Sequence, residues 1–115
     1  EGYPAGEIKH GPIALIEKGV PVIVIAPSDN LIEKTISNVE EVLSRGAKVI
    51  FISDKVGIKK INNKKTINLC LPEVHELISP ILYTIPVQLI AYHIAVLRGT
   101  DVDQPRNLAK SVTVE

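Results

Sequence analysis

The sequence contains few aromatic residues and a single cysteine, and each shortage excludes a class of protein. Aromatic residues make up 3% of the 115 residues, too few for a nucleic-acid-binding surface that stacks bases on exposed rings. Cys70 is the only cysteine, so the chain forms neither an internal disulfide framework nor a zinc site with several cysteines. A lone thiol inside the apolar run INLCLP is typical of a small buried hydrophobe in a reducing compartment.

The chain also lacks an excess of charge of either sign. Thirteen basic residues balance thirteen acidic ones, for a formal net charge of zero. No overall field therefore attracts nucleic acid or an anionic membrane, and we expect neither partner. The basic run KKINNKK, residues 59–65, is interpreted as an exposed connecting loop rather than a phosphate-binding or nucleic-acid-binding contact.

One long apolar stretch, residues 81–97, raises the question of a membrane helix. Pro86, Gln88 and His93 interrupt it, so we expect no membrane span. The stretch is better explained as a helix buried on most sides, in the core or against a partner. Within it, His93 is expected to be a hydrogen-bonded core histidine.

Apolar runs alternate with a helical pattern and predict an α/β fold. Buried strands are expected at residues 20–27, 47–53 and 66–72 because each run is short, apolar and rich in β-branched residues. A helix is expected between the first two, beginning with a capping box at Asn30 and Glu33 and ending at Gly46. The order strand, helix, strand predicts a parallel, doubly wound sheet.

The last helix and the thinness of the sheet complete the fold prediction. Ser79 and Pro80 are expected to begin the apolar helix, and Gly99 to end it. Three parallel strands are few for a doubly wound sheet, which normally has about five. The chain also begins at Glu1, inside what reads as a structured motif. We therefore expect a fold that is truncated at its N-terminus.

The carboxyl ends of parallel strands are where ligands bind in such sheets. Ser28 and Asp29 follow the first strand, but they are expected to be turn and cap residues. No Walker lysine and no G-x-G-x-x-G loop follows any strand, so the common nucleotide-binding motifs are absent. The group Glu73, His75 and Glu76 has no spacing that places a ligand set on one face, and we predict no metal site and no cofactor.

Two residues could carry chemistry, and the sequence pattern leaves their roles open. His10 lies in GEIKHGP between glycines that punctuate the backbone, and a histidine can move protons at neutral pH. Lys110 lies in the polar tail. It could form a Schiff base with a carbonyl, hold a phosphate or an oxyanion through its charge, or be a solvated lysine.

Three stretches give the chain a specific resemblance along its whole length. It resembles the C-terminus of the glucosamine–fructose-6-phosphate aminotransferase (isomerizing) family, least closely in residues 54–65, which we interpret as a loop. Pro4 stands where the family often has a small residue. The stretches that carry the resemblance are EGYPAGEIKHGPIALI, VPVIVIAP and YHIAVLRGTDVDQPRNLAKSVTVE.

The resemblance implies a fold, a reaction and residue roles. It implies the later part of a flavodoxin-like sugar isomerase (SIS) domain in residues 1–99 and an active-site tail in residues 100–115. The family transfers glutamine-derived ammonia to fructose 6-phosphate and makes glucosamine 6-phosphate, a step of hexosamine biosynthesis. His10 matches a histidine that helps to open the sugar ring in the neighbouring subunit. Lys110 matches the Schiff-base lysine, and Ala109 lines the site.

The resemblance also implies partners and parts that this chain lacks. We expect a cytoplasmic homodimer whose glutaminase domain, first SIS domain and proton-shuttling carboxylate lie outside this sequence. Cys70 does not match the glutaminase cysteine, and the chain alone is expected to be inactive. Two other functions remain open: a non-catalytic SIS-type module that senses sugar phosphates, and a structural half-domain that pairs through the apolar helix.

Overall fold

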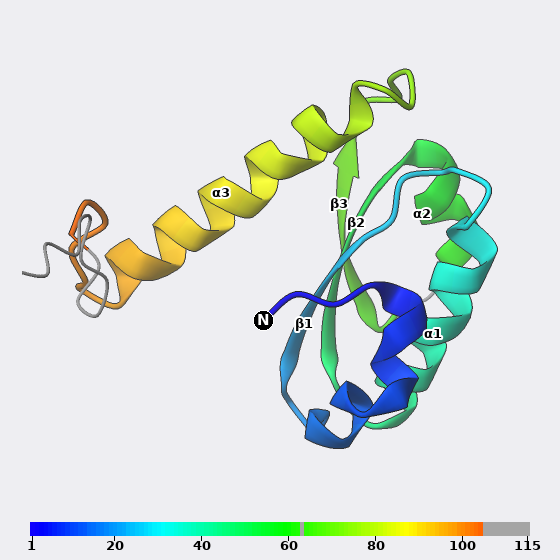
Figure 1. The fold of residues 1–115 in the computed structure, drawn as a ribbon, viewed down its shortest axis with the longest axis horizontal. Helices are drawn as coiled ribbons and strands as arrows, with labels where there is room; N and C mark the ends of the chain where they lie inside the picture. Colours follow the sequence, from blue (N-terminus) through cyan, green and yellow to red (C-terminus); the bar gives the residue numbers. More distant parts are fainter. Residues whose placement is uncertain (63, 105–115) are drawn as a thin grey trace, which may run out of the picture. The chain divides into compact units, whose positions relative to one another are not determined.

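The computed structural model describes residues 1–62 and 64–104. Residues Glu1–Ser79 form one compact unit, and a second unit begins at Pro80. The first unit is an α/β fold, as predicted (Figure 1). Its elements are, in chain order, η1 (Ala5–His10), η2 (Pro12–Leu15), β1 (Pro21–Ile25), α1 (Ile32–Ser44), β2 (Lys48–Asp54), α2 (Lys55–Ile61) and β3 (Thr66–Leu71).

The three strands form one parallel sheet in the order β1-β2-β3. Figure 1 shows α1 and α2 together on one face of this sheet. The three strands and α1 are all where the apolar runs predicted them. The short helix α2 was not predicted, because residues 54–65 read as a loop.

The hydrophobic core fills the space between the sheet and the two helices. Phe51 and Ile52 of β2 are completely buried. Phe51 belongs to a cluster in which aliphatic side chains of α1 pack on alternate residues of the strands, as period-two strands require. The buried members of this cluster are Ala26, Ile32, Val39, Val42, Leu43, Ala47, Val49, Phe51 and Ile61.

The opposite face of the sheet is apolar but partly open. Two rows of paired residues cross the three strands on this face. One row is Ile23, Ile50 and Ile67, and the other is Ile25, Ile52 and Leu69. The four outer members of these rows are all exposed: Ile23, Ile25, Ile67 and Leu69. Burial of the strands was therefore predicted correctly only for β2. An apolar run shows that a strand can be buried, but a covering layer decides whether it is.

The two ends of α1 test the predictions made for them. Asn30 does not cap the helix, so the predicted capping box is wrong. Instead, Asp29 forms a turn in which its carboxylate accepts a hydrogen bond of 2.8 Å from the backbone N–H of Leu31. Gly46 follows the helix with φ of +86°, as predicted for a helix stop.

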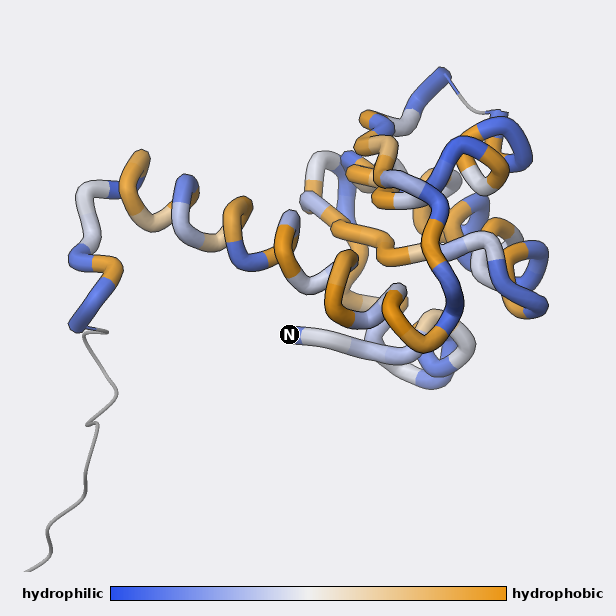
Figure 2. Tube along the Cα trace, turned by 90° about the horizontal axis from the view of Figure 1, so that it is seen from above, coloured by the Kyte–Doolittle hydropathy of each residue, from blue (hydrophilic) through white to orange (hydrophobic). Residues whose placement is uncertain are grey.

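Helix α3 (Ser79–Leu97) lies in the second unit except for its first residue, and it is apolar on every turn (Figure 2). By length and composition it is a helix that could cross a membrane, with a mean hydropathy of 1.6. The predicted helix is confirmed, and Gly99 follows it with φ of +67°. Within this chain 6% of its apolar window is buried, and the expected burial against a partner stays a prediction. His93 is exposed and lies edge-on to the Tyr92 ring, so it is not a core histidine.

Candidate functional site

His10 is the last residue of η1 and lies exposed at a tight turn. The 3₁₀ helix before it is held by a hydrogen bond of 2.9 Å from Glu7 N–H to the Pro4 carbonyl. Gly11 separates η1 from η2, and Pro12 is the first residue of η2. The imidazole is thus presented at the surface on a short, well-defined piece of backbone. This is an arrangement from which it could exchange protons with a bound molecule.

The other two predicted site residues, Ala109 and Lys110, lie outside the described residues. The described part of the tail ends at Gln104. In it, Asp101 accepts a hydrogen bond of 2.9 Å from the backbone N–H of Asp103. The grouping of His10 with Lys110 in one site therefore stays a prediction.

The carboxyl edge of the sheet, where a ligand would be expected, is occupied by Asp54. This carboxylate is 5% exposed. One oxygen accepts hydrogen bonds from the Ser28 backbone at 3.0 Å and from the Ser28 hydroxyl at 2.5 Å. The other accepts from the N–H groups of Val56 at 2.9 Å and Gly57 at 3.0 Å. Four donors thus occupy the two oxygens of Asp54. The carboxylate connects the loop after β1 to the start of α2, and we assign it a structural role rather than a ligand-binding one.

The environment of Asp54 lowers its pKa. Burial alone would raise it, but the hydrogen bonds from Ser28, Gly57 and Val56 stabilise the ionised form and outweigh burial. Because the pKa of Asp54 is lower in the folded state, the ionised carboxylate stabilises the fold. This contribution to the free energy of unfolding is complete at pH values above the ordinary carboxyl pKa of about 4. The contribution is lost as the pH falls through the lowered pKa.

We predict that Asp54→Asn lowers the free energy of unfolding at pH 7 by about 1–3 kcal/mol, because the amide presents N–H groups to donors. Urea unfolding at pH 7 and pH 3 measures this loss, which should shrink at the lower pH. Asp29→Asn is the matched control: Asp29 is exposed, and its carboxylate accepts one hydrogen bond. A loss for Asp54→Asn that is equal at both pH values would contradict the role assigned to the ionised carboxylate.

Directly before Asp54, Ser53 brings α2 close to β1. Its buried hydroxyl donates a hydrogen bond of 2.5 Å to the Ala26 carbonyl. Gly57 lies against this pair: a Cβ there would be 1.9 Å from the Ser53 oxygen. The sequence analysis identified the carboxyl edge of the sheet as a place of interest, but it did not identify Gly57. A single glycine in a stretch that resembles a loop does not indicate a close contact.

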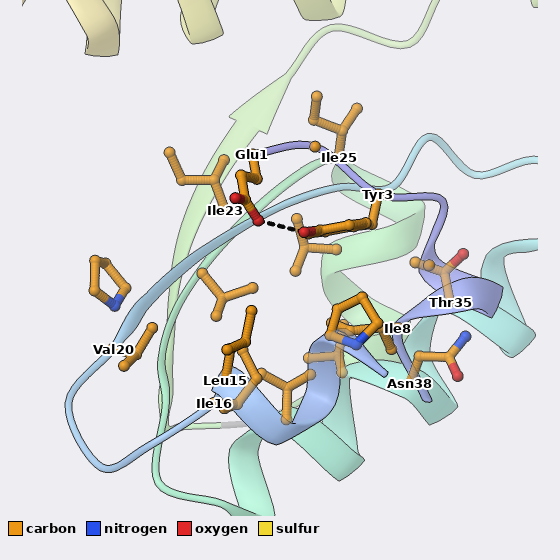
Figure 3. Close-up of a pocket in the computed structure, with 18 residues that line it drawn as sticks. Glu1, Tyr3, Ile8, Leu15, Ile16, Val20, Ile23, Ile25, Thr35 and Asn38 are labelled. Carbon is orange, nitrogen blue, oxygen red and sulfur yellow. Dashed lines mark hydrogen bonds between the residues drawn. The ribbon is translucent and has the colours of Figure 1, made fainter. Parts of the chain in front are cut away.

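An apolar cavity of about 500 Å³ lies beside β1 and is lined by residues of η1, η2 and α1 (Figure 3). Its polar groups are few: Glu1, Tyr3, Thr35 and Asn38. The Tyr3 hydroxyl donates a hydrogen bond to the Glu1 carboxylate, which raises the pKa of Tyr3. His10 is not among the lining residues. The cavity is therefore separate from the predicted catalytic residue.

No metal site is found within residues 1–62 and 64–104, where no three His, Cys, Asp or Glu side chains are grouped to hold an ion. Glu73, His75 and Glu76 are all exposed. The Nδ1 atom of His75 accepts a hydrogen bond of 3.3 Å from the Leu77 backbone N–H. Cys70 is also exposed, although its apolar neighbours had predicted burial.

Comparison with known proteins places the chain in a family. The model of the SIS domain matches residues 1–98. The glutamine–fructose-6-phosphate aminotransferase (isomerizing) of Zymomonas mobilis is 64% identical over all 115 residues, which span 19% of its length. The protein of the same name from Sphingobium yanoikuyae is 62% identical, and this chain covers 74% of it.

A solved structure agrees with these sequence comparisons. The C-terminal domain of glucosamine-fructose-6-phosphate aminotransferase from Francisella tularensis is 46% identical and superposes with a TM-score of 0.84. The match covers 89% of this chain and 29% of that one. The chain belongs to the SIS domain family and, within it, to the glutamine–fructose-6-phosphate aminotransferases.

Proposed function

We propose that this chain is the part of an isomerising aminotransferase that supplies a proton-transfer residue and an amine nucleophile to fructose 6-phosphate. The observation that carries the proposal is the identity of 58–64% with proteins of this name along the whole chain, tail included. A structural half-domain or a sugar-phosphate sensor would have no use for a tail that carries a Schiff-base lysine. The reaction proposed for the complete protein converts fructose 6-phosphate and glutamine-derived ammonia into glucosamine 6-phosphate.

His10 is proposed to assist the opening of the sugar ring. In ring opening the C2 hydroxyl loses its proton, a carbonyl forms at C2, and the ring oxygen leaves C2 and takes up a proton. An imidazole can carry out one of these transfers at neutral pH. The exposed position of His10 at the end of η1 supports this role. We propose that it acts on the sugar bound to the neighbouring subunit of a homodimer.

Lys110 is proposed to attack the open-chain ketose. Its amine forms a bond to C2, and the carbonyl oxygen leaves as water, which gives a Schiff base. Ammonia then replaces the lysine nitrogen, and a proton moves from C1 to C2. Ala109 would line the sugar site beside Lys110. The reaction needs no metal and no bound cofactor.

The proposed organisation follows from these roles. Residues 1–99 would belong to an SIS domain, and residues 100–115 would form the tail that brings Lys110 to the sugar. The remaining domains would release ammonia and hold the sugar phosphate. Because this chain spans 19% of the length of the Zymomonas mobilis relative, we propose that it is inactive without them. The complete enzyme would work in the cytoplasm.

Borohydride trapping tests the proposal. The complete enzyme is incubated with fructose 6-phosphate, reduced with borohydride, digested, and mapped by peptide mass. We expect a reduced sugar adduct on Lys110, because borohydride converts a Schiff base into a stable amine. Other lysines of the chain, such as Lys48, provide the internal control. An unmodified Lys110 in enzyme that binds the sugar would overturn the proposal and favour a sugar-phosphate-sensing module.

A further inference from the structure

We infer that Gly11 is a positioning residue that sets the direction in which His10 faces its substrate. This inference rests on the proposed role of His10 in ring opening. It adds a second residue to that role, one that acts through His10. The observations that support it are the backbone conformation of Gly11, the space around it and its place between two helices.

The conformation of Gly11 is one that only glycine adopts without strain. Its φ is +151° and its ψ is −56°, far from the regions that side chains with a Cβ allow. The residue is the C-cap of η1, immediately after His10, and the N-cap of η2, where its carbonyl accepts a hydrogen bond of 2.9 Å from Ala14 N–H. Pro12 then fixes the next φ. The direction that the chain takes after His10 therefore depends on this one residue.

The space around Gly11 shows what kind of constraint it is. A Cβ placed on Gly11 would meet no atom within 4 Å. Glycine is therefore not required to avoid a clash, as it is at Gly57. It is required because a side chain would drive the backbone out of its positive φ. The expected consequence is a turned peptide between η1 and η2 and a displaced imidazole, not an unfolded domain.

A displaced imidazole should affect ring opening far more than binding. Proton transfer needs donor and acceptor within hydrogen-bond reach. A misplacement of about 1 Å can lower the rate by about 10²-fold. Substrates that already carry an open chain do not need this step. They should be converted at nearly the normal rate whatever the direction of the His10 ring.

The test compares two substrates in the complete enzyme. One is fructose 6-phosphate, which is cyclic. The other is 5-deoxyfructose 6-phosphate, which lacks the hydroxyl that closes the ring. Gly11→Ala should lower kcat on the cyclic sugar by about 10- to 100-fold. It should leave kcat on the open-chain analogue within about threefold of the wild-type value. His10→Ala should show the same selectivity.

Gly19→Ala is the matched control. Gly19 also has a positive φ, +89°, and a Cβ there would likewise meet nothing within 4 Å. It lies in the turn before β1, away from His10 in sequence. The strain, of order 1–3 kcal/mol, should therefore lower Tm in both variants. Only Gly11→Ala should change the ratio of kcat on the cyclic sugar to kcat on the open-chain analogue.

The outcomes separate the inference from the proposed function. If His10→Ala is selective for the cyclic sugar but Gly11→Ala slows both substrates equally, Gly11 is not a positioning residue. The same conclusion follows if Gly19→Ala is as selective as Gly11→Ala, or if Gly11→Ala fails to fold while Gly19→Ala folds. If His10→Ala itself slows both substrates equally, the proposed role of His10 is wrong.

Discussion

Lys110→Ala in the complete enzyme should abolish the formation of glucosamine 6-phosphate while glutamine is still bound and hydrolysed. The loss in kcat should be on the order of 10³-fold or more, because removal of a nucleophile removes the whole covalent route. Product formation and glutamate release are measured in parallel assays. Glutamine hydrolysis should survive the loss of sugar amination because the glutaminase site belongs to a different domain in the proposed organisation. A variant that makes glucosamine 6-phosphate at the wild-type rate would end the assignment of Lys110.

Lys110→Arg is the control that distinguishes an amine from a charge. Arginine keeps the positive charge and most of the length of the side chain, but it stays protonated and cannot form a Schiff base. If Lys110 acts as a nucleophile, Lys110→Arg should be as inactive as Lys110→Ala. If it only holds a phosphate or an oxyanion, Lys110→Arg should recover much of the lost rate. Recovery would keep Lys110 in the site but remove its covalent role.

The strands and α1 could be predicted because their signals are local. Residues 20–27 and 47–53 are short β-branched runs, and the spacing of Ile36, Val39 and Leu43 has helical period. The structure places β1, β2 and α1 accordingly. Helix α2 was not predicted because it has only seven residues, KVGIKKI, and the third of them is a glycine. The helix begins after Asp54, whose side chain caps it. In the sequence, an aspartate that caps a helix cannot be distinguished from an aspartate in an ordinary turn.

Burial was predicted less well than secondary structure, because it depends on the rest of the molecule. Leu69 and Cys70 of β3 belong to a run that reads as a core strand, yet both are exposed in this chain. For the candidate site the same limit applies. The chemistry of His10 and Lys110 could be named from residue types, whereas their roles came from resemblance. The conformation of Gly11 could be seen only in the structure.

Gly57→Ala should be among the most destabilising single substitutions in the first unit. A Cβ at this position would lie 1.9 Å from the Ser53 oxygen, 3.1 Å from the Ser53 Cβ and 3.4 Å from the Ala26 carbonyl oxygen. Alanine normally improves a helix by about 1 kcal/mol over glycine. Here two larger costs oppose that gain.

The first cost is the hydrogen bond of Ser53. Its side chain is completely buried, so its hydroxyl can avoid the new methyl group only by breaking its bond to Ala26 and losing a partner, which costs about 1–3 kcal/mol. The second cost is crowding, about 1–3 kcal/mol for an added methyl group in a packed core. Gly57 also donates to Asp54, so a shift of α2 would weaken its cap. We expect a net loss of about 2–4 kcal/mol.

Urea unfolding of the 115-residue chain, followed by far-UV circular dichroism, measures this loss, and a double-mutant cycle with Ser53→Ala identifies its cause. Ser53→Ala alone should cost about 1 kcal/mol for the lost hydrogen bond. In the double variant the oxygen that collides with the new methyl group is gone. The pair should therefore be less destabilised than the sum of the single variants, by about 0.5–3 kcal/mol. Strict additivity would show that Gly57 is needed for its backbone and not for the close approach of Ser53.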